Sequence, residues 1–188
     1  AILRGEAGVG KSHLARWLAE RAHELGAATP LVLRHGPIEA RGQGIAGALA
    51  AMLASSGLRG ETLEARLSAS LDEPRESVLV QGLAEIIDPA RGEAPPRLRF
   101  DAASERHALV RQLLARACEE RPLLLVVDDA QWGLDALGLV RHLTRSAPLP
   151  ILVVLTVEED ALEGHEVAAA LLDTLAAAST RCGQRVPR

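Results

Sequence analysis

Eight residues near the start of the chain have the types and spacing that phosphate chemistry needs. They fit the pattern G-x-x-x-x-G-K-[ST], a phosphate-binding loop, and they read Gly5-Glu6-Ala7-Gly8-Val9-Gly10-Lys11-Ser12. Glycines let such a loop curl so that its N–H groups point inward at phosphate oxygens. Lys11 can reach the β- and γ-phosphates and Ser12 can ligate Mg²⁺. With His13, which begins the next helix, these residues are the predicted nucleotide-binding set.

The neighbours of the loop support this interpretation over a chance match in a glycine-containing turn. An apolar run, residues 1–3, predicts a strand before it. Leu14, Leu18, Ala22 and Leu25 predict the apolar face of a helix after it. Lys11 is also the only lysine among 21 basic residues, which fits a need for a point charge on a slim stem.

A second group of candidate residues follows a buried strand far downstream. Five apolar residues, 123–127, end in Asp128 and Asp129, as in a parallel strand buried on both faces. The carboxyl end of such a strand lies near the nucleotide crevice. We assign Asp128 to Mg²⁺ and Asp129 to the catalytic base that orients or deprotonates the attacking water. The alternative is that two acids simply end a strand at the surface.

Thr156 ends the next apolar strand, residues 151–156, and is a third catalytic candidate beside Lys11 and Asp129. A hydroxyl there can sense the γ-phosphate, or it can belong to an ordinary strand-end threonine. Trp132 is expected either in the core or packed behind Asp129. The six histidines are read as structural or exposed.

The elements that position these residues alternate between strands and helices, which predicts an α/β fold with a mainly parallel sheet. Residues 31–33 predict a second strand. A mainly helical insertion is expected over 37–100, with helices at 43–56, 63–71 and 74–87, Pro74 standing in a first helical turn. Further helices are expected at 104–120, 133–146 and 158–180. The length of 188 residues suits one domain, which we expect to be part of a longer chain.

Composition narrows the class of partners. The net charge of −4 implies no strong attraction to nucleic acid or membrane surfaces, and no apolar run approaches the ~20 residues of a membrane span. Two cysteines suit neither a disulfide framework nor a zinc site. With no visible signal peptide, a cytoplasmic protein is expected. The guanine-reading pattern N-K-x-D needs a second lysine, so ATP is favoured over GTP.

Residues 5–12, together with residues 124–132 (LLVVDDAQW), resemble the AAA-type ATPase domain of STAND signalling proteins. Similar domains occur in large LuxR-type regulators and beside serine/threonine kinase or adenylate cyclase domains. The resemblance implies a three-layer P-loop NTPase sandwich, ATP and Mg²⁺ as cofactors, and the Thr156 strand between the first strand and the Asp128 strand. A truncated fifth strand is expected near Val186, beside the first.

Two departures from that family pattern bear on catalysis. The family often has T-x-R after the last apolar strand, and in this chain Glu158 stands in place of the arginine. The family also often has W-x-D after the acidic pair, and in this chain the acid, Asp135, stands one position later. The leading hypothesis is a slow ATPase switch that works with other domains of its polypeptide, with self-association in the ATP-bound state left open. A non-hydrolysing nucleotide scaffold and a motor or DNA-handling ATPase are the alternatives.

Overall fold

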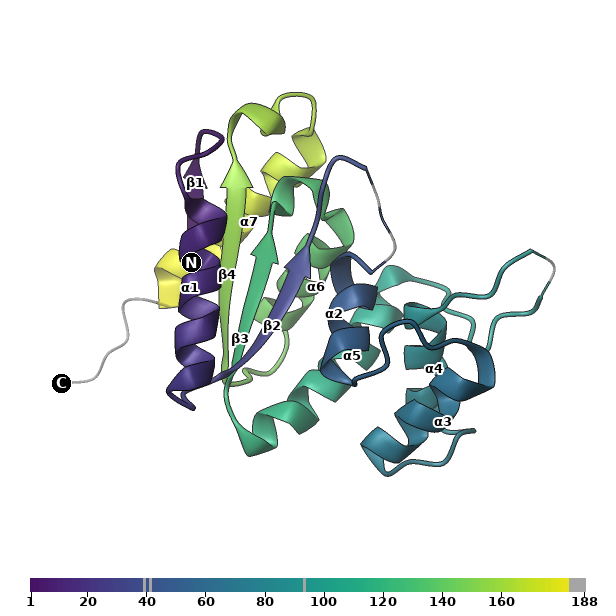
Figure 1. Cartoon of the computed structure of the whole chain (residues 1–188). Helices are drawn as coiled ribbons and strands as arrows, with labels where there is room; N and C mark the ends of the chain where they lie inside the picture. Colours follow the sequence, from purple (N-terminus) through teal and green to yellow (C-terminus); the bar gives the residue numbers. More distant parts are fainter. Residues whose placement is uncertain (39, 41, 93, 183–188) are drawn as a thin grey trace.

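Four parallel strands form the sheet that carries the candidate site. The computed structural model describes residues 1–38, 40, 42–92 and 94–182. The strands are β1 (Ile2–Gly5), β2 (Thr29–Arg34), β3 (Leu123–Asp128) and β4 (Ile151–Glu158), in the spatial order β1-β4-β3-β2. The predicted α/β class and the place of β4 between β1 and β3 are confirmed. All four carboxyl ends lie at one edge of the sheet, where the loops meet (Figure 1).

Helices cover the two faces of this sheet unequally. One face is covered by α1 (Lys11–Glu24), which packs on Leu124, Val126 and Val154. The other face meets a larger core built from α5 (Ala103–Glu120), α6 (Leu134–Arg145) and α7 (Glu166–Cys182). Three further helices, α2 (Gly44–Met52), α3 (Gly60–Leu71) and α4 (Val78–Ile87), extend this core beyond β2 (Figure 1). The result is a three-layer sandwich with a helical lobe at its β2 side.

The packed face of α1 agrees with the predicted one only in part, since Leu18 and Ala22 pack against the sheet but Leu14 and Leu25 do not. Ala15 and Ala19 are the buried residues of the helix, while Leu14 and Leu25 are 50% and 65% exposed. The reason is that the phosphate loop fixes the rotation of the helix. Ser12 has to face the strand ends, and residues three and seven positions later then point at the sheet. Small side chains there let α1 approach the strands closely.

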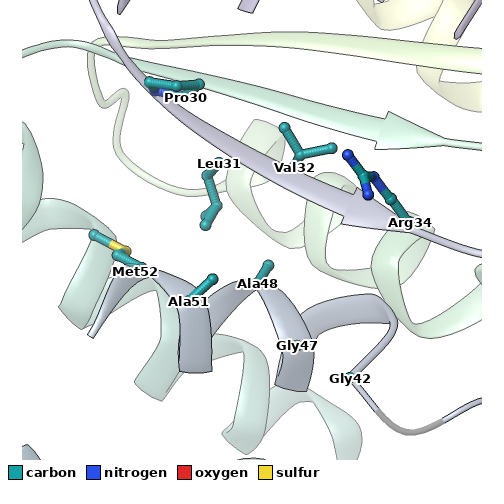
Figure 2. A pocket seen from close by; sticks show the side chains of 9 residues that line it. All are labelled: Pro30, Leu31, Val32, Arg34, Gly42, Gly47, Ala48, Ala51 and Met52. Atoms are coloured by element: carbon teal, nitrogen blue, oxygen red, sulfur yellow. The ribbon is translucent and has the colours of Figure 1, made fainter. Parts of the chain in front are cut away.

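The strand β2 lies at one edge of the described sheet and separates two different environments. Pro30 precedes the strand predicted at 31–33 but lies inside β2, where an edge strand tolerates a residue without an N–H. Leu31 points from β2 toward Ala48 and Ala51 of α2, across a cavity of about 440 Å³ (Figure 2). Val32 and Arg34 stand on the opposite side of the strand, which is the α1 side.

Several element boundaries differ from the sequence predictions; α2, for example, ends at Met52 and α3 begins at Gly60. The helix α4 begins at Val78, not near Pro74, because the Ser77 side chain caps it by accepting a hydrogen bond from the Val80 N–H at 3.2 Å. The strand β4 continues to Glu158, and a short 3-10 helix (Asp160–Leu162) precedes α7, so the prediction of a helix from 158 is wrong at its start. The expected strand near Val186 lies outside the described residues.

Candidate nucleotide-binding site

The phosphate loop joins β1 to α1 through two left-handed glycines. Gly8 and Gly10 have φ angles of 77° and 93°, which a side chain would strain. Gly10 also stands at the helix start, and its carbonyl accepts the first helical hydrogen bond from the Leu14 N–H at 2.9 Å. The free N–H groups of the first helical turn therefore open directly onto the loop.

Lys11 lies across the loop that precedes it. Its Nζ donates to the Gly5 carbonyl at 2.8 Å and to the Glu6 carbonyl at 2.6 Å. An ammonium group has three N–H donors, so one remains for an anion. The two carbonyls thus hold the charge at the centre of the loop, where a phosphate would be bound.

A cavity of about 300 Å³ lies between the loop and the ends of β3 and β4. Residues of both groups line it, namely Ala7, Gly8, Gly10, Lys11, Ser12, His13, Asp129 and Glu158. Six of the nine predicted binding residues therefore border one cavity. The other three, Gly5, Glu6 and Val9, belong to the loop but not to this lining, and Val9 is 61% exposed.

The two acids after β3 face different parts of the site. Asp129 borders the 300 Å³ cavity, whereas Asp128 borders a separate cavity of about 30 Å³ together with Ser12. The backbone separates them because Asp129 is left-handed, with φ 55° and ψ 51°, a region that Asp visits more readily than most residues. The geometry fits two separate roles, one at the metal side and one at the phosphate side.

Thr156 is fully buried behind these acids and joins them. Its hydroxyl donates to Asp128 Oδ1 at 2.7 Å and accepts from the Asp129 N–H at 2.9 Å. The side chain does not border either cavity that the acids line. These contacts favour a positioning role for Thr156, in which it acts on the site through Asp128 and Asp129.

Gln131 is a positioning residue to which the sequence analysis gave no role, although it stands in the DDAQW segment that carries the family resemblance. It is 1% exposed, its Nε2 donates to Asp129 Oδ1 at 3.5 Å, and its Oε1 accepts from the Glu158 N–H at 3.2 Å. It therefore ties the loop after β3 to the end of β4. The signal for it was a glutamine in an otherwise apolar stretch, because a buried amide needs polar partners.

Glu158 faces the phosphate loop. It pairs in register with Gly5 on the neighbouring strand and borders the same cavity as Lys11 and Asp129. The departure from T-x-R thus places a carboxylate on the cavity wall, where it adds negative charge beside a triphosphate.

Asp135, the second departure, lies away from this cavity. Its Oδ1 accepts from His107 Nε2 at 2.9 Å and from Arg106 Nη2 at 3.0 Å, linking α6 to α5. The hydrogen bond from His107, aided by the Arg106 charge, lowers the pKa of Asp135. Burial, with His107 and Arg111 nearby, lowers the pKa of His142.

Trp132 is half-buried rather than in the core. Its ring makes an edge-on contact with His165, with centroids 4.7 Å apart. The next residue, Gly133, lies so close to the His35 ring that a Cβ there would be 2.6 Å from His35 Nε2. This close approach gives a physical reason for glycine at position 133. The family pattern W-x-D has one residue between the tryptophan and the acid, whereas this chain has two, Gly133 and Leu134.

The donors at the metal side fit Mg²⁺. Ser12 offers a hydroxyl and Asp128 a carboxylate, both hard oxygen ligands around one small cavity. Among residues 1–38, 40, 42–92 and 94–182, no group of three or more His, Cys, Asp or Glu could hold a metal. Mg²⁺ binds through one or two protein oxygens, water and substrate phosphates, and Ser12 and Asp128 would supply the protein oxygens.

The parallel four-stranded sheet flanked by helices is consistent with a P-loop NTPase-like fold, and the candidate site lies at the carboxyl edge of the sheet. A family model described as AAA ATPase domain matches residues 1–155, and the chain belongs to that family. The matched range includes the helical lobe and reaches into β4 as far as Leu155. No curated protein and no solved structure matches the chain. In the described part, no helix is long and apolar enough to cross a membrane.

Proposed function

We propose that this domain binds ATP with Mg²⁺ and hydrolyses it slowly, as the switch of a multidomain signalling or transcription-regulatory protein. Membership of the AAA ATPase domain family supports nucleotide binding and hydrolysis as the activity. The absence of N-K-x-D favours ATP over GTP.

One observation carries the proposal. A single cavity has the cation of Lys11 and the hydroxyl of Ser12 on its loop side and the carboxylate of Asp129 on its strand side. A triphosphate bound by the loop would place its terminal phosphate toward Asp129. Nucleophilic water between the phosphate and the carboxylate is then within reach of a base.

In this scheme each residue has a limited task. Mg²⁺, held by Ser12 and Asp128, would offset charge on the β- and γ-phosphates. Asp129 accepts a proton from the attacking water as the water oxygen bonds to the γ-phosphorus. The bond from that phosphorus to the bridging oxygen breaks, giving ADP and inorganic phosphate. Thr156 and Gln131 fix the orientation of the acids.

A second candidate is a nucleotide-binding scaffold that does not hydrolyse. Glu158 favours it, because a carboxylate on the cavity wall repels the γ-phosphate where the family often has an arginine. In other phosphoryl-transfer enzymes a catalytic arginine contributes about 10³–10⁵ in rate. The proposal therefore includes slow ATP hydrolysis, whereas the scaffold alternative predicts no hydrolysis at all.

The domain as a whole is proposed to comprise residues 1–188, with 37–100 a mainly helical insertion. Its proposed partners are ATP and ADP, other domains of the same polypeptide, and further copies in the ATP-bound state. A cytoplasmic location is proposed because ATP is available there. The net charge of −4 supports the expectation that this domain makes no direct contact with nucleic acid or membrane.

Isothermal calorimetry with Mg-ATP tests the proposal. Lys11→Ala is expected to remove most of the affinity, because it deletes the main side-chain charge in the loop. Arg21→Ala is the matched control, since Arg21 lies on the same helix and is ion-paired only with Glu24 among the described residues. A dissociation constant that is equal in the Lys11→Ala and parent proteins contradicts the assignment of the phosphate loop.

A further inference from the structure

Two arginines stand on the metal side of the phosphate loop. The strand alternation puts Leu31 and Leu33 in the large core and Val32 and Arg34 on the α1 face (Figure 2). Arg34 pairs in register with Asp128 on β3, so both side chains stand on the same face of adjacent strands. Arg16 reaches the same place from the second turn of α1.

These side chains border a small cavity. It measures about 30 Å³, and Ser12, Arg16, Val32, Arg34, Val126 and Asp128 line it. Two of these are the proposed metal-side residues, and two are arginines. The volume suits one or two waters, so both arginine side chains border the same small space as Ser12 and Asp128.

The charge at this cavity is not balanced by protein carboxylates. Within the described residues, neither Arg16 nor Arg34 has an acidic oxygen within 4 Å, whereas Arg97 alone meets three acids. The nearest acid in the cavity, Asp128, accepts its hydrogen bond from Thr156. Positive charge therefore accumulates where the nucleotide's own negative charge is proposed to arrive.

We propose that Arg16 and Arg34 bind the phosphate tail of the nucleotide from the metal side and partly substitute for Mg²⁺ in holding it. This inference rests on the proposed function, since it concerns the same site. A guanidinium offers a planar fork of donors that matches phosphate oxygens. The loop and Lys11 would hold the tail from one side and the two arginines from the other.

The pair also changes what the metal contributes. Two guanidinium groups close to Mg²⁺ repel it, so part of the metal's binding energy is lost to that repulsion. The same groups attract the bare triphosphate when no metal is present. Nucleotide affinity should therefore depend less on Mg²⁺ in the parent than in a protein without these arginines.

Calorimetric titration with ATP, in Mg²⁺ and in EDTA, measures this directly without relying on turnover. In EDTA, Arg34→Gln and Arg16→Gln should each weaken ATP binding by about tenfold or more, the range expected for a charge-assisted hydrogen bond. In Mg²⁺ the loss should be clearly smaller. Arg34→Lys, which keeps the charge but not the fork, should lie between parent and Arg34→Gln in EDTA.

Arg21→Gln is the matched control, because it removes an exposed arginine from α1 far from the cavity. Thermal melts of each variant establish that it is folded. If the parent binds ATP in Mg²⁺ but the Arg16 and Arg34 variants behave like Arg21→Gln in EDTA, this inference is overturned while the proposed function stands. A parent that binds in Mg²⁺ but not at all in EDTA overturns it too. A parent that fails to bind even in Mg²⁺ overturns the proposed function itself.

Discussion

Replacing Thr156 by valine should both destabilise the domain and disturb its acids. The substitution keeps the shape of the side chain and removes only the hydroxyl. That hydroxyl donates to Asp128 Oδ1 and accepts from the Asp129 N–H, and the threonine is fully buried. The variant therefore leaves a carboxylate oxygen without its donor and a backbone N–H without its acceptor.

The size of the effect follows from these two bonds. A hydrogen bond to a charged group contributes about 1.5–3 kcal/mol, and an unsatisfied buried donor costs about 1–3 kcal/mol. Asp128 and Asp129 are only half-buried, so water can replace part of what is lost. We expect a loss of about 2 kcal/mol in the free energy of unfolding. For a domain of this length that lowers Tm by about 4–8 °C.

Urea unfolding and thermal melts of three variants measure this loss. Thr156→Ser should recover most of the stability, because it restores the hydroxyl. Thr174→Val is the control, since Thr174 is exposed on α7 and, among the described residues, its hydroxyl bonds only to the Ala170 carbonyl; its effect should stay within about 0.5 kcal/mol. In ATP hydrolysis, Thr156→Val should lower kcat more than it weakens ATP binding.

Equal stabilities of Thr156→Val and Thr174→Val would refute the positioning role. That result would favour γ-phosphate sensing instead. In that case Thr156→Val would keep the parent stability while losing the preference for ATP over ADP. The two readings of Thr156 therefore separate in a stability measurement and a binding measurement on the same protein.

Three further predictions concern the charges around the site. Asp129→Asn should keep ATP binding and slow hydrolysis by about 10²–10⁴, and an unchanged rate would place the base elsewhere. Glu158→Arg should speed single-turnover hydrolysis because the position borders the cavity, with Glu158→Gln separating loss of repulsion from gain of a cation. Asp135 has a lowered pKa in the folded state, so its stabilising effect should be full above the unfolded value of about 4 and fall at lower pH. The stability difference between parent and Asp135→Asn should shrink on acidification, by a modest amount because the carboxylate is half-exposed; a difference that does not change with pH contradicts it.

The glycine-rich turn between β1 and α1 was predictable because the residues that form it are local. A run of eight residues contains the two left-handed glycines, the cation and the hydroxyl, and each has its role from its own type and spacing. The sheet class was predictable for a similar reason, since continuous apolar runs identify β3 and β4 without knowledge of their neighbours.

What the sequence did not reveal depends on distant pairing. The contact of Thr156 with both acids exists only because β4 lies beside β3 with Leu155 opposite Val127, a register that no local pattern specifies. The predicted face of α1 was only partly right, with Leu18 and Ala22 packed on the sheet, for a related reason. Hydrophobicity favoured Leu14 and Leu25, but the loop had already fixed the helix rotation through Ser12, and alanines face the sheet.

The order of the strands gives the site a charge gradient that no single strand contains. Across the carboxyl edge, β4 ends in Glu158, β3 in two acids and β2 in Arg34. Acid thus occupies the wall where the family often has an arginine, and arginine occupies the metal side. This arrangement should bind a triphosphate firmly while doing little to stabilise the charge that develops on transfer. Fast hydrolysis in the parent, together with no effect of Glu158→Arg on the rate, would contradict this argument. It would show that solvent screens the charges at the carboxyl edge and that the phosphate loop alone determines the rate of hydrolysis.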